Sequence, residues 1–361
     1  MWPYWLMFLV PAVTSLCSRS RRPRIEDGAR AGGSFFSWLF VWLATTMLVG
    51  LRSDVGGDWT NYFQYLDDVA GRDLSQILVK NDPGYLVLNW LSTEIDCGIY
   101  GVNLMCGALF ATGLVMFCRR QTLPWLGLAV AIPYMVIVVA MGYSRQGVAL
   151  GIAMLGLNAL ENKSALWFVV WVTVAATFHI SALLLMPIAA LASTQNRFWA
   201  AIWVGLTFGI AYKLMLEKEV GALYTNYVQT QYQSDGALVR LLMNAIPAVI
   251  YLKWRVRFQF SEPATRLWTW FAVLSLVFLG LFVISSSTTA VDRVALYLLP
   301  LQIVVFARLP FLMSAVGASK SNAIHAQLGV LSYYAAVQFV WLNFGSFSSA
   351  WIPYRIYPFE A

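Results

Sequence analysis

The stretch WLFVWLATTMLVGLRSDVGGDWTNY, residues 38–62, joins a long apolar run to a polar and aromatic loop. The run up to Leu51 contains no charged residue and, with the residues before it, is long enough for a helix through the apolar part of a membrane. Arg52 follows at once, and the Gly56–Gly57 pair predicts a break in the helix. The stretch therefore predicts a membrane helix that ends in a polar loop.

The same alternation of apolar runs and short polar loops continues along the 361 residues. Hydrophobic residues make up 60% of the chain and charged residues only 11%, against roughly 25% in a typical soluble domain. No segment remains that could bury a sizeable soluble core. The composition therefore excludes a soluble fold and predicts a single integral membrane domain over residues 1–361.

The apolar stretches predict an all-α, polytopic transmembrane helical bundle of about twelve spans, in a range of roughly 10–14. Several stretches are shorter than the ~20 residues that a perpendicular helix needs, so we expect some broken or half-spanning helices. The predicted spans lie at 2–17, 34–51, 99–118, 123–141, 146–160, 165–178, 180–192, 198–216, 239–254, 267–285, 294–309 and 324–343.

Basic residues are concentrated in a few loops, which sets the expected orientation. Loops 19–30 and 253–266 are rich in Arg and Lys, which favour the cytoplasmic side of a membrane. Threading the chain from an outside N-terminus then puts 15 of the 24 basic but 4 of the 17 acidic residues in the cytoplasm. The remaining 9 basic and 13 acidic residues face outward, where the larger loops 52–98 and 217–238 also lie.

Several kinds of site are not expected. The cysteines, Cys17, Cys97, Cys106 and Cys118, are scattered without CxxC spacing, which favours neither a zinc site nor a disulfide framework. The chain also lacks a phosphate-binding Walker loop, so we expect no metal and no cofactor. Because the net charge of +7 reflects the inner loops, it predicts contact with membrane lipids and no binding of nucleic acid.

The outer loop 52–98 combines carboxylates with aromatic side chains, a combination that suits sugars. Aromatic faces stack on pyranose rings, while carboxylates accept hydrogen bonds from hydroxyl groups. The alternative is an aromatic belt at the membrane interface with solvated charges. The glycan-binding candidates are Asp54, Trp59, Tyr62 and Tyr85, with Tyr297 from a later segment.

Ionisable residues at the edge of a membrane span are costly, so each is a functional candidate. Arg52 is a candidate for holding an anion, and Asp58 is a candidate base, with Tyr62 one helical turn further on if a helix resumes. Arg145 stands alone in a short outward turn, where the preference of basic residues for the cytoplasm disfavours it. The alternative for each arginine is a side chain that extends to the interface.

Three later segments add further candidates. His179 has apolar neighbours, and an ordinary pKa near 6.5 suits a general base, although a lone histidine is more often a packing residue. Asp292 and Arg293 begin the eleventh span, and Tyr297 is expected on the helix face of Arg293. Arg355 lies among aromatic residues near the C-terminus, where it could equally be an interfacial anchor.

Four arginines, Arg52, Arg145, Arg293 and Arg355, are thus expected on the side that ordinarily lacks basic residues. Their planar guanidinium groups bind phosphate oxygens in a bidentate manner, so together they predict a diphosphate site. A polyprenyl-diphosphate glycan presents both a diphosphate and a sugar outside the cytoplasm, and is therefore the expected ligand.

These segments resemble the EpsG family of Wzy-type polysaccharide polymerases. The similarity rests on RSDVGGDWTNY, DPGYLVLNWL, YSRQGVALGIAM, TFHISALLLMP, VDRVALYLLPLQ and a final WIPYR, which follow the order of the family. The resemblance implies a GT-C-like glycosyltransferase that joins oligosaccharide repeat units on undecaprenyl diphosphate. It places the active site at the periplasmic face of the bacterial inner membrane. The product would be an O-antigen, a capsule or an exopolysaccharide.

The resemblance also implies roles for the candidate residues. The lipid-linked growing chain would be the donor, a lipid-linked repeat unit the acceptor, and a chain-length regulator a further partner. Arg52, Arg145 and Arg293 would stabilise the diphosphate leaving group, and His179 or Asp58 would take the proton of the acceptor hydroxyl. The catalytic set is His179, Asp58, Arg145, Arg52 and Asp292, and the diphosphate-binding set is Arg52, Arg145, Arg293 and Arg355.

Two other classes of function remain open at this stage. A flippase or secondary transporter of lipid-linked glycans would carry several ionisable groups near the middle of the membrane, between two pseudo-symmetric halves. A membrane O-acyltransferase would need its histidine deep in the membrane or accessible from the cytoplasm. The concentration of ionisable groups at the predicted outer ends of the spans favours the polymerase.

Overall fold

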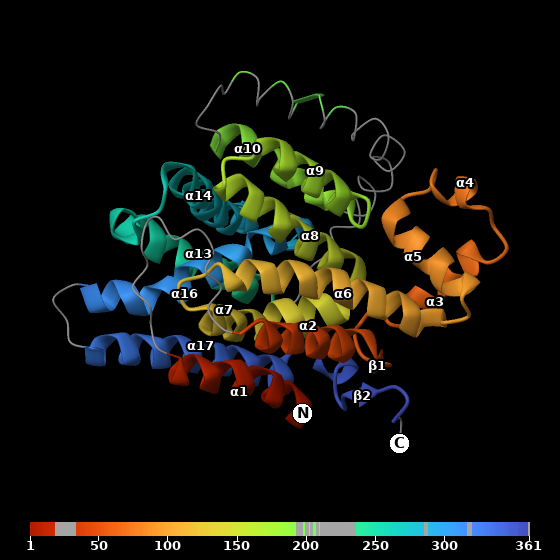
Figure 1. Cartoon of the computed structure of the whole chain (residues 1–361), viewed down its shortest axis with the longest axis horizontal. Coiled ribbons are helices and arrows are strands. Elements are labelled where there is room, and N and C mark those ends of the chain that lie inside the picture. Colours follow the sequence, from red (N-terminus) through yellow and green to blue (C-terminus); the bar gives the residue numbers. More distant parts are fainter. Residues whose placement is uncertain are drawn as a thin grey trace.

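The computed structural model describes residues 1–18, 34–192, 236–284, 288–315 and 320–359, and five single residues between 198 and 209. Most of these residues are helical, and the helices pack side by side in one bundle (Figure 1). The all-α expectation is confirmed. The two short strands of the described part form a single antiparallel pair.

The elements of the first half are α1 (Trp2–Cys17), α2 (Phe35–Gly50), β1 (Arg52–Ser53), α3 (Asn61–Val69), α4 (Leu74–Ile77), α5 (Pro83–Glu94), α6 (Gly98–Arg119), α7 (Pro124–Ala131), η1 (Ile132–Ala140), α8 (Ser144–Glu161), α9 (Ala165–Ala176), η2 (Ile180–Leu185) and α10 (Met186–Ala192). Those of the second half are α13 (Ala237–Trp254), η5 (Arg255–Phe258), α14 (Glu262–Ile284), α15 (Thr288–Ala295), η6 (Leu296–Leu298), α16 (Pro300–Ala315), α17 (Lys320–Phe344), η7 (Ser348–Ala350) and β2 (Arg355–Ile356).

The predicted apolar stretches, apart from 198–216, coincide with helices of this structure. The stretch 198–216 and the loop 217–238 fall largely outside the described residues. Of the described helices, α6, the segment Ala237–Phe258 and α14 are long and apolar enough to cross a membrane individually. The bent pair formed by Val291–Leu298 and Pro300–Ser314 would be a fourth span. The helices therefore indicate a membrane protein, while the number of twelve spans stays a prediction.

Several helices are interrupted, as their lengths suggested. The chain leaves the helical path after α9 and resumes as the 3-10 helix η2, and η6 separates α15 from α16 with a bend of 41°. This second interruption corrects one expectation. Because the helix tightens at Leu296, Tyr297 does not share a face with Arg293: Tyr297 is buried, whereas Arg293 is exposed.

Glycines allow the helices around α6 to approach closely. A Cβ atom on Gly113 of α6 would lie 1.8 Å from the carbonyl oxygen of Gly151 in α8, and one on Gly50 of α2 would lie 2.6 Å from Cα of Leu104 in α6. Membrane helices commonly pack through such small residues, because no water is released to drive their association. The contacts position the ends of α2 and α8 beside α6.

The C-terminal segment pairs with the start of loop 52–98, which we call the first loop. β2 pairs with β1 so that Arg52 lies opposite Ile356 and Ser53 lies opposite Arg355. The buried Trp351 donates from Nε1 to the carbonyl oxygen of Ile137, 2.7 Å away, and its own carbonyl oxygen accepts from Tyr4 Oη at 2.6 Å. The last residues of the chain therefore connect α1, η1 and the end of α2.

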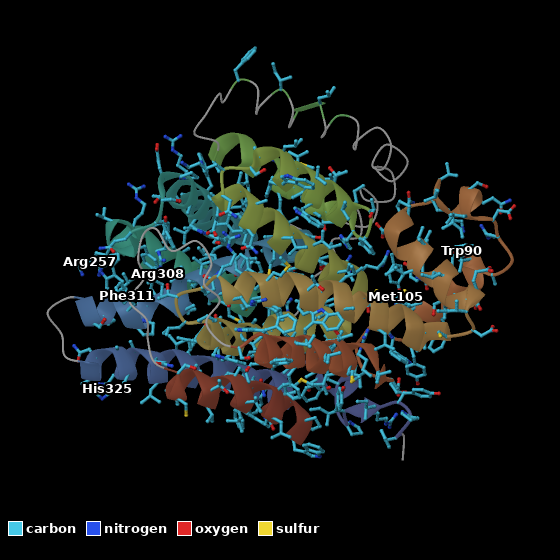
Figure 2. The ribbon with its side chains drawn as sticks, in the orientation of Figure 1. Trp90, Met105, Arg257, Arg308, Phe311 and His325 are labelled. Carbon is cyan, nitrogen blue, oxygen red and sulfur yellow. The ribbon has the colours of Figure 1, made fainter. Side chains whose placement is uncertain are left out.

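The two ends of the bundle carry different residues and helices. Arg257, Arg308 and His325 lie toward one end, and Trp90 lies toward the other (Figure 2). The second end, called the Trp90 end, carries α3, α4 and α5 beyond the ends of the long helices (Figure 1). Loop 52–98 therefore lies at the Trp90 end, while the side of the membrane that this end faces stays a prediction.

A pair of single cysteines tests which end faces outward. Arg72 lies between α3 and α4 at the Trp90 end (Figure 1), Arg257 lies in η5 toward the opposite end (Figure 2), and both side chains are exposed. We expect R72C to react with a membrane-impermeant maleimide in intact cells and R257C to react only after lysis, because basic loops favour the cytoplasm. Cys17 and Cys97 are exposed and are replaced beforehand, whereas Cys106 and Cys118 are buried. The reverse labelling pattern would invert the orientation.

Candidate functional site

Arg52 is the first charged residue after α2, and its side chain is completely buried. Its guanidinium donates to Ser144 Oγ at 2.7 Å, to Asn103 Oδ1 at 3.3 Å and to the carbonyl oxygens of Val55 and Val49. A buried charge needs such partners, because desolvation is costly. The expected role of Arg52 as a diphosphate ligand is therefore corrected: its guanidinium is directed to internal acceptors and has no exposed surface.

The N-terminus of α8 is held by two residues of the first loop. Tyr62 Oη accepts a hydrogen bond of 2.8 Å from the backbone nitrogen of Ser144, one of the N–H groups that have no partner within the helix. Arg52 holds the side chain of the same serine. Because Ser144 immediately precedes Arg145, these bonds fix the backbone from which the Arg145 side chain extends.

Arg145 reaches from α8 toward the helices of the first loop. Its Nη1 lies 2.7 Å from Asp82 Oδ2, and its guanidinium lies 4.9 Å from the ring centre of Tyr65 and 6.0 Å from that of Tyr85. The arginine side chain is 30% exposed, so one part of the guanidinium remains accessible. This agrees with the expectation that Arg145 has a specific anionic partner, which in this structure is a carboxylate.

Asp82 was missed by the sequence-based search. It precedes α5 and adopts a left-handed backbone conformation with φ +51°, which asparagine and aspartate tolerate better than most residues. The next residues dock α5 onto the end of α9: Gly84 N donates to the carbonyl oxygen of Thr177 at 2.9 Å, and a Cβ on Gly84 would lie 2.4 Å from Thr177 Oγ1. The sequence Asp82-Pro83-Gly84 was the signal that could have identified this turn before α5.

His179 lies in the break between α9 and η2. Its Nδ1 is 2.5 Å from Ser181 Oγ and accepts from the backbone nitrogen of Ser181 at 3.4 Å. Ser181 Oγ also lies 3.2 Å from Tyr297 Oη. Burial and the positive charges of Arg145 and Arg293 lower the pKa of His179. The imidazole is therefore neutral at physiological pH.

Asp58 lies in the turn before α3 and is partly buried. Burial raises the pKa of its carboxyl, and this shift is opposed by the positive charges of Arg293 and Arg145 and by a hydrogen bond to Asn61. The same two arginines thus act on Asp58 and on His179. We call Asp58, Arg145, His179 and Arg293 the Arg145 cluster. In the described part of the chain, no three His, Cys, Asp or Glu residues are grouped as metal ligands.

Asp292 has a different partner from the one nearest in sequence. It forms a bidentate pair with Arg240 of α13, with Nε–Oδ1 and Nη2–Oδ2 distances of 2.8 Å. Its neighbour Arg293 is exposed, and the carbonyl oxygen of Arg293 accepts from Gln146 Nε2 at 2.8 Å. Asp292 therefore joins α15 to α13. Gln146, the residue after Arg145, holds the backbone of Arg293 beside the first turn of α8.

Arg355 and Asp54 form an ion pair of 3.0 Å beside the β1–β2 ladder, and both side chains are largely exposed. In this structure the partner of Arg355 is therefore the carboxylate of Asp54, and binding of a diphosphate by Arg355 stays a prediction.

The expected glycan-binding rings are corrected by their burial. Tyr85 is 0%, Tyr62 and Tyr297 are 2%, and Trp59 is 8% exposed, so these rings have no face on which a sugar could stack. They pack as core residues beneath the site, with Tyr62 and Tyr85 ring centres 6.0 Å apart. The half-exposed Tyr65 and Tyr143 and the exposed Phe63 are the nearby rings with accessible surface.

Comparison with known proteins gives one match. The model of the EpsG family matches residues 35–356, from the start of α2 to the end of β2, and thus includes the whole Arg145 cluster. No curated protein and no solved structure matches the chain.

Removing one hydroxyl tests whether Tyr62 supports the helix that carries Arg145. We expect Y62F to lose about 1–3 kcal/mol of stability, because the buried backbone N–H of Ser144 loses its acceptor. The measurement is thermal unfolding in detergent. Y357F is the matched control, since the Tyr357 side chain is exposed. Equal stability of both variants would contradict the supporting role of Tyr62.

Proposed function

The chain belongs to the EpsG family, a family of Wzy-like polymerases, and we propose that it polymerises a polysaccharide as a membrane glycosyltransferase. Its donor would be the growing glycan on undecaprenyl diphosphate, and its acceptor the sugar of one lipid-linked repeat unit. The observation that carries this proposal is the Arg145 cluster, in which the charges of Arg145 and Arg293 act on the carboxyl of Asp58 and on the neutral imidazole of His179.

Arg145 and Arg293 are the proposed ligands of the diphosphate. Asp82 now holds Arg145 through a single carboxylate oxygen at 2.7 Å, which is the distance expected for a charge-assisted bond to a phosphate oxygen. The proposed substrate displaces Asp82 and brings Arg145 and Arg293 onto the same diphosphate. Because these side chains are partly exposed, they are accessible to a lipid head group, whereas Arg52 is not.

The proposed reaction is a displacement at the anomeric carbon of the donor sugar. The oxygen of the acceptor hydroxyl forms the new bond to this carbon, and the bond from the carbon to the diphosphate oxygen breaks. The electron pair of the broken bond goes to the diphosphate, where two guanidiniums stabilise the growing negative charge. The proton of the acceptor hydroxyl passes to Asp58 or to His179, the two proton acceptors of the Arg145 cluster.

The other predicted catalytic residues have structural roles in this proposal. Arg52 holds the first loop against α8, and Asp292 joins α15 to α13 through Arg240. Arg355 joins the C-terminal segment to Asp54. Tyr65, Tyr143 and Phe63 take the place of the buried rings as sugar-facing residues. The proposed location is the bacterial inner membrane with the Trp90 end in the periplasm, and the GT-C-like architecture belongs to the same proposal.

The transporter and acyltransferase alternatives fit the placement of the ionisable groups less well. Arg145 of the Arg145 cluster lies in the first turn of α8 and is paired with Asp82 of loop 52–98, whose helices extend beyond the long helices at the Trp90 end (Figure 1). A transport pathway would instead need charges along the middle of the bundle. An acyltransferase that receives its acyl group from the cytoplasm would need His179 at the opposite end.

Substitution of Arg145 tests the proposed leaving-group role. We expect R145A to reduce elongation of a synthetic polyprenyl-diphosphate repeat unit by about 100-fold or more in reconstituted vesicles, because one donor to the developing charge is lost. R145K should recover only part of the activity, since lysine lacks the bidentate fork. The product length is read from a gel.

The control for this experiment is R72A. Arg72 is exposed in the same outer loop but belongs to the turn between α3 and α4. It should elongate normally, and both variants should accumulate in the membrane like the wild type. Near-normal chain growth by R145A would contradict the leaving-group role, and failure of the wild type under conditions that support a known polymerase would contradict the function itself.

A further inference from the structure

The backbone at His179 determines which ring nitrogen carries the hydrogen. His179 is extended, with φ −156° and ψ 115°, and caps the 3-10 helix η2. In this position its Nδ1 receives the backbone N–H of Ser181 at 3.4 Å, and a backbone N–H can only donate. Nδ1 must therefore present its lone pair to this N–H, while Ser181 Oγ lies 2.5 Å from the same atom. The hydrogen of the neutral ring lies on Nε2.

We propose that His179 acts through its Nε2–H as a hydrogen-bond donor to the diphosphate, that Asp58 is the base, and that Ser181 is the positioning residue that sets this division of roles. The inference rests on the proposed glycosyl transfer and assigns the two proton-handling residues that the reaction left open. The observation that carries it is the hydrogen bond from the backbone N–H of Ser181 to His179 Nδ1.

Tyr297 completes the arrangement behind Ser181. Its ring is buried, and its Oη lies 3.2 Å from Ser181 Oγ. Ser181 Oγ donates its hydrogen to Tyr297 Oη, so Tyr297 fixes the orientation of the serine side chain beside the imidazole. A residue expected to contact a glycan therefore lies behind Ser181 and His179.

The charges around Asp58 and His179 support the same assignment, with Asp58 as the base and His179 as the hydrogen-bond donor. Arg145 of α8 and Arg293 of α15 both act on Asp58 and on His179, and Tyr62, Tyr65 and Tyr143 lie around Asp58. If His179 took the proton, a third cation would form beside two guanidiniums. If Asp58 takes it, a carboxylate becomes neutral. Burial that raises the pKa of Asp58 also makes its carboxylate a stronger base.

This assignment defines where the acceptor proton and the electron pair of the breaking bond go during glycosyl transfer. The acceptor hydroxyl loses its proton to the Asp58 carboxylate as its oxygen bonds to the anomeric carbon. The electron pair of the breaking bond stays on the diphosphate oxygen, which receives hydrogen bonds from His179 Nε2–H and from the arginines. His179 keeps its hydrogen throughout. Asp58 returns its proton to water before the next cycle.

The tautomer can be measured without any substrate. The chain contains two histidines, His179 and His325, and His325 is exposed in α17 at the end opposite the Trp90 end. In protein labelled with ¹⁵N-histidine, H325Q isolates the signal of His179. We expect the Nε2–H form at neutral pH, and the same form in S181A, because the backbone N–H that donates to Nδ1 is retained. A predominant Nδ1–H form in the H325Q protein would overturn the proposal.

Activity measurements test the division of roles independently. We expect H179A to lose about 100-fold or more in elongation rate, and H179Q to retain at least about tenfold more activity than H179A, because an amide N–H replaces Nε2–H. D58N should remove activity. In H179Q the rate should still fall as pH is lowered through the raised pKa of Asp58, because protonation removes the base.

Two results would contradict the assignment. If H179Q is as inactive as H179A, or if H179Q has lost the fall in rate at low pH, His179 is the base. S181A should keep the fall in rate at low pH, because its backbone N–H remains, and loss of that fall would contradict the assignment of Asp58 as the base. Absence of elongation by the wild type would instead refute the proposed function, while the tautomer measurement would still stand.

Discussion

The buried guanidinium of Arg52 is the interaction on which the site end of this protein depends. A cation without solvent contact is stable only when its donors are used, and Arg52 meets this requirement by bonding to groups from α2, the first loop, α6 and α8. Its backbone also pairs with β2. One residue therefore holds together segments that are distant in the sequence, and the N-terminus of α8 is among them.

The site forms around this fixed point. Arg145 extends from the first turn of α8, and Asp82, which precedes α5, pairs with it. The start of α5 is itself hydrogen-bonded to Thr177, two residues before His179. Arg293 joins through Gln146, the residue after Arg145. The positive field of the two arginines then has opposite consequences for two neighbours: it disfavours a charged imidazole at His179 and favours a charged carboxylate at Asp58.

The helical fold and the candidate site residues could be predicted from the sequence. Long apolar runs give the helices their positions, because the membrane requires each segment to satisfy its own backbone hydrogen bonds. Asp58, Arg145, His179 and Arg293 were recognised because ionisable groups at span ends are costly. Asp82, Arg240 and Ser181 were missed, because their importance depends on contacts that only the fold creates. These contacts are with Arg145, Asp292 and His179 Nδ1, respectively.

The sequence by itself determined that this is a helical membrane protein and identified candidate ionisable residues near the ends of its helices, because hydropathy and charge are properties of short segments. The tertiary structure decided which of these residues are available for chemistry. Arg52, Tyr62, Tyr85 and Tyr297 differ little from Arg145 and Tyr65 in sequence context, yet they are buried. Burial and hydrogen-bond direction depend on neighbours from distant segments, and these are set only when the helices pack.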